Sequence, residues 1–92
     1  MKAVIINYAL ERSRASERVI IHRTLYGHTD FSNNGSYQYE REGILDTIPK
    51  IKLGKGVLVV SDKDKNRVLR VLKKNKASVK SIPIDINKAM LH

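Results

Sequence analysis

Runs of apolar residues mark four segments of the chain that we expect to form β-strands. Residues 2–8 and 57–60 are rich in β-branched side chains, and the second run is continuously apolar, as in a central strand. Residues 18–27 contain three consecutive β-branched residues and predict another strand. Residues 78–86 predict the last strand, and Pro83, which has no backbone N–H, places it at a sheet edge or a bulge.

The sequence from Asn33 to Ser36, Asn-Asn-Gly-Ser, predicts a β-hairpin. Asn-Gly favours a two-residue type I′ turn because both central residues need a positive φ. With Asn34 and Gly35 at the centre, Asn33 faces Ser36, and the pairing continues outward from there. Because side chains alternate along each strand, one face of the hairpin then carries a polar and aromatic set: His28, Asp30, Ser32, Tyr37, Tyr39 and Arg41.

Residues 62–75 have the spacing of an amphipathic helix. Ser61 is a candidate N-cap, and Asp62 and Asp64 in the first turn suit the positive end of the helix dipole. The apolar side chains fall on one side of this helix: Val68, Leu69, Val71 and Leu72. Four cationic side chains fall on the opposite side: Lys63, Arg67, Arg70 and Lys74.

Together these elements predict an α+β fold, a small single-domain sandwich of a four- to five-stranded sheet with one main helix at 62–75. The helix and its flanking strands form a βαβ-like unit, which is right-handed if the strands are parallel. Residues 9–16 have no apolar stripe and predict a loop or one helical turn, and residues 49–56 predict an irregular basic segment. We treat 1–92 as one domain and expect the tail at 87–92 to fray.

Composition excludes several classes of protein. The chain has a net charge of +9 and no cysteine, which excludes a disulfide framework, a zinc knuckle and a thiol nucleophile. No apolar run approaches the roughly 18–20 residues that span a bilayer, and no secretory signal is evident. We therefore expect a cytoplasmic protein. Abundant Lys and Ile also fit a heat-adapted source.

The excess positive charge lies in the second half of the chain. Residues 1–46 hold six basic and six acidic side chains, whereas residues 47–92 hold twelve basic and three acidic ones. Such an uneven distribution favours one face that binds polyanions. In the first half, four arginines near Glu11 and Glu17 are expected to form local ion pairs: Arg12, Arg14, Arg18 and Arg23.

Three groups of side chains are candidates for contact with a polyanion. The predicted helix offers Lys63, Arg67, Arg70 and Lys74, flanked by Lys73. The segment at 49–56 offers Lys50, Lys52 and Lys55 beside two glycines, although the spacing of a P-loop is missing. The hairpin offers Tyr37, Tyr39, Arg41 and His28, which can stack on unpaired bases. The alternative interpretations are a solvated helix face, a surface turn and tyrosines that pack sideways on the sheet.

These groups lead us to expect a small basic nucleic-acid-binding protein, with RNA in a ribonucleoprotein such as the ribosome as the first hypothesis. A dimeric DNA-binding regulator or architectural protein is an alternative, with Pro83 near the dimer edge. A metal-dependent nuclease is another, because Asp62 and Asp64 directly follow a strand. An acidic protein partner fits the same charge. We expect no cofactor, no metal site and no catalytic residue.

Overall fold

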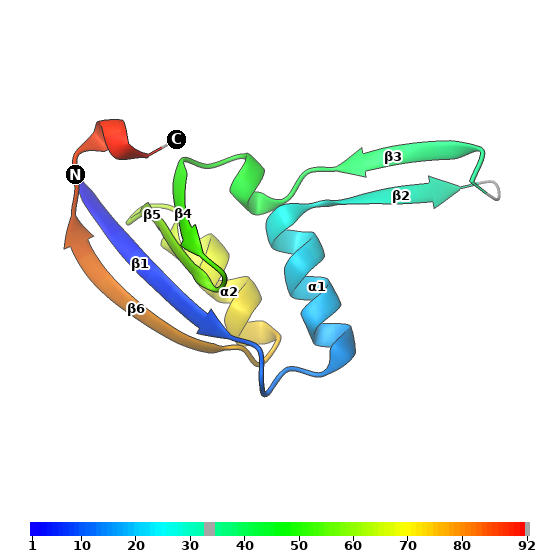
Figure 1. Ribbon diagram of the computed structural model, residues 1–92, viewed down its shortest axis with the longest axis horizontal. Helices are drawn as coiled ribbons and strands as arrows, with labels where there is room; N and C mark the ends of the chain where they lie inside the picture. Colours follow the sequence, from blue (N-terminus) through cyan, green and yellow to red (C-terminus); the bar gives the residue numbers. More distant parts are fainter. Residues whose placement is uncertain (33–34, 92) are drawn as a thin grey trace.

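A four-stranded antiparallel sheet with two helices on one face forms the body of the protein, and a two-stranded ribbon extends from it (Figure 1). The computed structural model describes residues 1–32 and 35–91. In chain order the elements are β1 (Lys2–Ala9), α1 (Ala15–Tyr26), β2 (His28–Ser32), β3 (Tyr37–Arg41), the 3-10 turn η1 (Ile44–Asp46), β4 (Lys50–Gly54), β5 (Val57–Ser61), α2 (Lys65–Lys74), β6 (Ser78–Asp85) and the 3-10 turn η2 (Lys88–Met90). The predicted α+β fold class is confirmed.

The strand order of the main sheet is β4-β5-β1-β6, and all neighbouring strands are antiparallel. Consequently β1 and β4 run parallel with β5 between them, and β5 and β6 run parallel with β1 between them. One helix lies in the connection of each parallel pair. This is the split βαβ, or ferredoxin-like, connectivity. The predicted C-terminal βαβ-like unit is confirmed, with parallel strands that are not adjacent, and Pro83 lies in an edge strand as expected.

The hydrophobic core lies between the main sheet and the two helices. Alternate residues of a strand face the same side, so Val4 and Ile6 of β1 and Leu58 and Val60 of β5 all point toward the helices. The core residues are Val4, Ile6, Ile21, Leu25, Leu45, Ile48, Leu58, Val60, Val68 and Leu72. Both helices therefore cover one face of the sheet, and their remaining sides are available for other contacts.

Residues 18–27 belong to helix α1 for most of their length, so the prediction of a strand there was wrong. Ile21 and Leu25, one helical turn apart, are almost completely buried, whereas Val19 and Ile20 are 46% and 49% exposed. A strand would have buried alternate residues instead. The burial of two apolar side chains at helical spacing outweighs the β-propensity of the three branched residues, which depends on context.

The prediction that residues 49–56 are irregular was also wrong, because Lys50–Gly54 is the edge strand β4. Its sequence from Lys50 to Leu53 alternates polar and apolar residues, which is the period of a half-buried strand. A two-residue turn at Lys55 and Gly56 joins it to β5. The glycines that suggested an irregular segment therefore belong to the end of one strand and to a tight turn.

Helix α2 begins three residues later than predicted and ends one residue earlier. Asp64, rather than Ser61, occupies the N-cap position. The Ser61 hydroxyl donates a hydrogen bond to Asp64 Oδ2 (2.8 Å), and the Lys65 ammonium donates one to Asp62 Oδ1 (2.9 Å). Both acidic side chains thus stabilise the turn that leads from β5 into the helix.

The ribbon formed by β2 and β3 has the predicted register: Asp30 lies opposite Tyr39, and the other pairs also have the predicted partners. Gly35 has a φ of 89°, as a hairpin turn requires, and the predicted turn residue Asn34 lies outside the described residues. The ribbon projects away from the body (Figure 1), and the molecule measures 48 × 31 × 20 Å. Its radius of gyration of 14.5 Å exceeds the roughly 12 Å of a compact domain of this length.

The N-terminus lies beside the end of β6. The Met1 amino group donates a hydrogen bond to Asp85 Oδ1 (2.8 Å). The tail that we expected to fray contains the turn η2, where Asn87 Oδ1 accepts a hydrogen bond from the Ala89 N–H (3.1 Å). Across the described parts of the chain, no helix is long and apolar enough to cross a bilayer.

Two glycines allow the end of α1 to touch the segment that follows the ribbon. Gly27 follows the last residue of α1 and has a φ of 80°. A Cβ at Gly27 would collide with the Arg41 carbonyl oxygen, and a Cβ at Gly43 would collide with the Leu25 carbonyl oxygen. The backbones on both sides of the ribbon are therefore in contact at its base, which fixes the ribbon against the body.

We expect Gly43→Ala to lower the free energy of unfolding by about 1–3 kcal/mol, because the added methyl group overpacks this contact. Gly54→Ala is the matched control, since a Cβ there has nothing within 4 Å, and it should change stability by less than about 0.5 kcal/mol. Urea unfolding followed by circular dichroism measures both. Equal stability of the two variants would contradict the proposed role of the contact.

Candidate nucleic-acid interface

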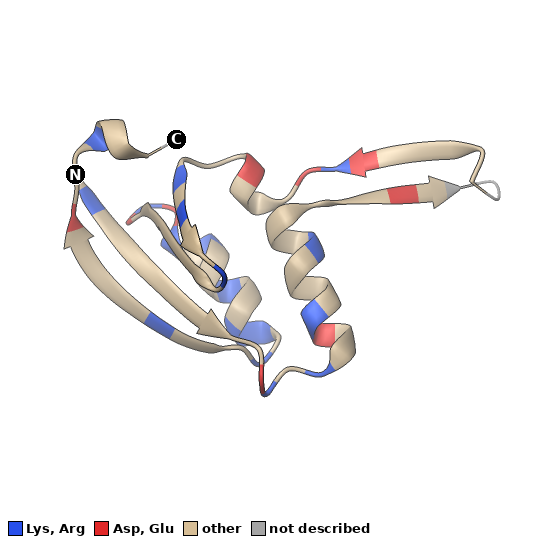
Figure 2. Cartoon of the chain, in the orientation of Figure 1, with Lys and Arg blue, Asp and Glu red and all other residues tan. Residues whose placement is uncertain are grey.

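The outer side of α2 carries the cationic side chains that the sequence predicted. Arg67, Arg70 and Lys74 are exposed, while Val68 and Leu72 of the same helix are completely buried. Lys63 is exposed in the turn before the helix, and Lys73 is exposed beside Lys74. Within the described ranges, none of these five side chains has a carboxylate partner, and Figure 2 shows the positive charge along the helix.

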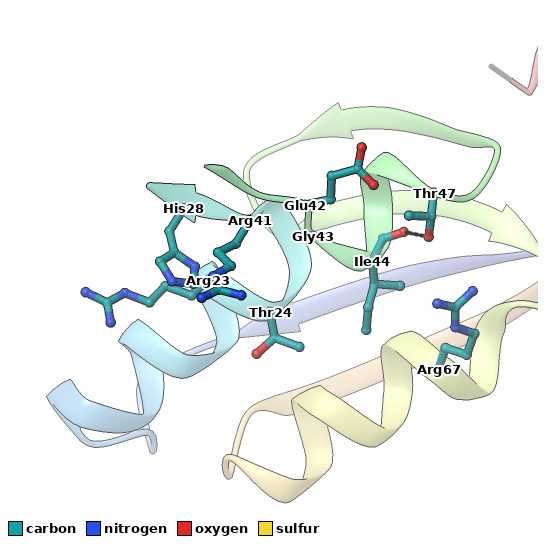
Figure 3. Close-up of a pocket in the computed structure, with 9 residues that line it drawn as sticks. All are labelled: Arg23, Thr24, His28, Arg41, Glu42, Gly43, Ile44, Thr47 and Arg67. Atoms are coloured by element: carbon teal, nitrogen blue, oxygen red, sulfur yellow. Dashed lines mark hydrogen bonds between the residues drawn. The ribbon is translucent and has the colours of Figure 1, made fainter. Parts of the chain in front are cut away.

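A pocket of about 350 Å³ brings α2 together with α1 and the base of the ribbon. Arg23 of α1, Arg41 at the end of β3 and Arg67 of α2 line it, together with His28 of β2. Figure 3 shows Arg23, Arg41 and His28 gathered at one end of the pocket and Arg67 at the other. Arginines from three elements thus line one pocket that is large enough for a phosphate group, and Glu42 is the one acidic residue of the lining.

Contacts with Asp30 hold Arg41 and His28 at the base of the ribbon. The Arg41 guanidinium donates through Nε to Asp30 Oδ2 (2.8 Å), and His28 Nε2 lies 2.9 Å from Asp30 Oδ1. The hydrogen bond from Arg41 is the largest cause that holds the pKa of the Asp30 carboxyl below its ordinary value. The two terminal nitrogens of Arg41 take no part in these contacts, so they remain available to bind an anion.

The tyrosines of the ribbon lie on the same face as these contacts. Tyr39 pairs with Asp30 and Tyr37 lies two residues away, so both side chains share a face with Arg41. Tyr37 and Tyr39 are 54% and 53% exposed, and they do not pack on the main sheet. Phe31 lies on the opposite face of the ribbon and is 63% exposed. The pocket thus brings together one residue of the predicted helix group, Arg67, and two of the hairpin group, Arg41 and His28.

The three lysines of the β4 region do not line that pocket. Lys52 and Lys55 line a different and larger pocket between β1, α1 and the β4–β5 turn, and Lys50 is half-buried on β4. On α1, Arg18, His22 and Tyr26 line this larger pocket, whereas Arg23 and Thr24 line the smaller one. Helix α1 therefore separates two basic sites that the sequence analysis had combined into one.

Arg23 and Arg18 were assigned to local ion pairs, and that assignment was wrong. Across the described residues, neither side chain lies in an ion pair with a carboxylate, and the Arg18 guanidinium donates instead to the Leu10 and Ser13 carbonyl oxygens (3.1 and 3.2 Å). A helical wheel of residues 15–26 would have separated Arg23 from Arg18. The β-branched residues favoured a strand, so the sequence analysis did not consider the helical positions of these two arginines.

The two acidic residues considered for metal binding have partners in the chain. Asp62 accepts a hydrogen bond from Lys65, and Asp64 accepts one from Ser61. Among the residues that the structure describes, no group of three or more His, Asp or Glu side chains has the arrangement of a metal site. Comparisons of the chain with protein-family models, with curated proteins and with solved structures found no match.

We expect Arg41→Met to raise the pKa of Asp30 toward its ordinary value, because the hydrogen bond and charge that lower it are removed. The Asp30 carboxylate stabilises the base of the ribbon fully above its ordinary pKa, and this contribution is lost as the pH falls through the lowered pKa. A carboxyl NMR titration measures the change. Asp85 is the internal control, since its pKa is lowered by the Met1 amino group and should not move. An unchanged Asp30 midpoint would contradict these contacts.

Proposed function

We propose that this protein binds nucleic acid in the cytoplasm through the surface formed by α2, the three-arginine pocket and the ribbon. RNA with unpaired nucleotides, as in a ribonucleoprotein such as the ribosome, is the preferred ligand. The observation that carries the proposal is the position of Arg67, which belongs both to the cationic side of α2 and to the pocket that Arg41 and His28 line. This shared residue links the cationic side of α2 to the base of the ribbon, which supports a single interface.

The cationic groups would contact the phosphate backbone. Like charges at helical spacing repel one another by a few tenths of a kcal/mol per pair, and an anionic backbone relieves this repulsion. Guanidinium groups bind phosphate oxygens in a bidentate manner, so Arg23 and Arg41 at one end of the pocket and Arg67 at the other suit phosphates of a strand that lies across the pocket (Figure 3). The lysines of α2 add a less directional attraction along the strand.

The ribbon would contact bases. Its two exposed tyrosines on one face offer flat surfaces on which unpaired bases stack, a contact worth about 1–3 kcal/mol per base. A second candidate ligand is duplex DNA, because a two-stranded ribbon also fits the major groove. Base stacking requires tyrosine rings and unpaired nucleotides, whereas groove binding requires neither.

We expect Arg67→Glu combined with Arg70→Glu to weaken binding of single-stranded RNA by at least about 2 kcal/mol, roughly thirtyfold, because two phosphate contacts become repulsive. The double variant should also reduce the salt dependence. With about six phosphate contacts, the logarithm of the binding constant falls with the logarithm of the salt concentration with a slope near −4 for a single strand and near −5 for a duplex. In the double variant the magnitude of this slope should decrease by about two.

The matched control is Lys80→Glu combined with Lys88→Glu, which changes the net charge equally at two exposed lysines outside both pockets. It should lose much less affinity in the same fluorescence-anisotropy titration. Equal losses in the two double variants would show that net charge, rather than this surface, determines binding. Circular dichroism should show both variants folded.

We expect Tyr37→Ala combined with Tyr39→Ala to weaken single-stranded RNA binding by about 1–3 kcal/mol for each base that stacks, with little effect on duplex DNA. Phe31→Ala removes an equally exposed aromatic ring from the opposite face of the ribbon and is the control. Electrophoretic mobility shifts with both ligands give the comparison. No loss on single-stranded RNA, together with duplex DNA bound at least as tightly as RNA, would favour the groove-binding candidate.

A further inference from the structure

A second pocket, larger than the three-arginine pocket, lies on the other side of α1 from the proposed interface. It has a volume of about 1050 Å³ and lies between the end of β1, helix α1 and the β4–β5 turn. Small-molecule sites typically occupy about 300–1,000 Å³, so this volume lies just above that range. The proposed interface makes no use of this pocket.

Two cations of the lining are held in place by the protein itself. The Lys52 ammonium lies 4.7 Å from the centre of the Tyr26 ring, a cation–π contact. The Arg18 Nε donates hydrogen bonds to two backbone carbonyl oxygens, at 3.1 and 3.2 Å, which leaves both terminal nitrogens of the guanidinium unused. Lys55 adds a third cation from the turn, and Glu11 is the one acidic residue of the lining. The pocket is therefore suited to an anion.

A pair of tyrosine hydroxyls supplies a further hydrogen-bond donor. Tyr8 and Tyr26 lie 3.0 Å apart at their hydroxyl oxygens, and neither hydroxyl has another partner among the described residues. One hydroxyl donates to the other, so one O–H of the pair is left without an acceptor. Burial and the contact with Tyr26 raise the pKa of Tyr8, so this hydroxyl stays protonated. The free O–H can donate to an oxygen or a nitrogen of a bound molecule.

Two aromatic rings form another part of the wall. His22 and Tyr26, one helical turn apart on α1, have ring centres 5.3 Å apart, and His22 is exposed. Flat rings beside three cations match a molecule that has a planar aromatic part and an anionic part. A nucleoside phosphate has both parts.

We propose that this pocket binds a nucleoside monophosphate, with the base against His22 and Tyr26 and the phosphate at Lys52, Lys55 and Arg18. The ligand is either a free nucleotide or a terminal nucleotide of a strand, because both present the same chemistry. The site does not depend on the proposed interface, since α1 lies between the two pockets.

The test is isothermal titration calorimetry of the whole protein with adenosine and uridine 5′-monophosphate, compared with inorganic phosphate and with adenosine. We expect at least one mononucleotide to bind about tenfold or more tightly than phosphate or nucleoside alone. Lys52→Met and His22→Ala should each weaken binding about tenfold, because one removes a charged hydrogen bond and the other a stacking surface. Both side chains are exposed, so both variants should fold, and Lys80→Met is the control that should bind normally.

Three results would overturn the proposal: no binding of any mononucleotide up to about 10 mM, unchanged affinity in Lys52→Met and His22→Ala, or phosphate alone binding as tightly as a mononucleotide. A 5′-phosphorylated and a 5′-hydroxyl hexanucleotide identify the source. If the protein prefers the phosphorylated strand and Lys52→Met abolishes this preference, the ligand is the terminal nucleotide of a strand. If both strands bind equally and a mononucleotide binds tightly, the ligand is a free nucleotide.

Strand binding and mononucleotide binding are measured separately, so failure of the proposed function can be distinguished from failure of the mononucleotide site. In the Arg67→Glu, Arg70→Glu double variant, mononucleotide binding should be unchanged, because neither arginine lines this pocket. Mononucleotide binding by a protein that binds no strand would overturn only the proposed function. Strand binding without mononucleotide binding would overturn only this inference.

Discussion

The packing of α1 on the sheet through Ile21 and Leu25 is the interaction on which both sites depend. Burial of these two side chains, worth about 1.5–3 kcal/mol each, sets the rotation of the helix. That rotation turns Arg23 toward α2 and turns Arg18, His22 and Tyr26 toward the β4–β5 turn. A helix rotated by a third of a turn would remove Ile21 and Leu25 from the core and move these side chains out of both pockets.

The split βαβ connectivity explains how distant segments meet. Because both crossover helices lie on the same face of the sheet, α1 and α2 are neighbours, although α2 begins 39 residues after α1 ends. The ribbon is an insertion between α1 and β4, and the contact between Gly27 and residues 41–43 fixes its base next to α2. The three-arginine pocket is therefore a product of connectivity rather than of any local motif.

An isolated two-stranded ribbon is at best marginally stable in water. In this protein the Arg41–Asp30–His28 network and the glycine contact anchor one end of the ribbon, while its two faces carry exposed aromatic rings. A cationic helix side and an aromatic ribbon both leave favourable interactions unmade in the free protein. In the proposed function, nucleic acid would provide partners for both, because it presents phosphates and bases at regular spacing.

The sequence by itself determined the elements whose patterns are local: the register of the hairpin around Gly35, the strand at 57–60, the cationic side of α2 and, for Pro83, an edge strand or a bulge. Each follows from turn chemistry, side-chain period or a missing N–H, which need no other part of the chain. Only the tertiary structure decided that Val19, Ile20 and Ile21 lie in a helix, since β-branched residues accept either conformation until packing selects one. It also decided which cations share a pocket, because Arg23, Arg41 and Arg67 are brought together by the crossing of three elements.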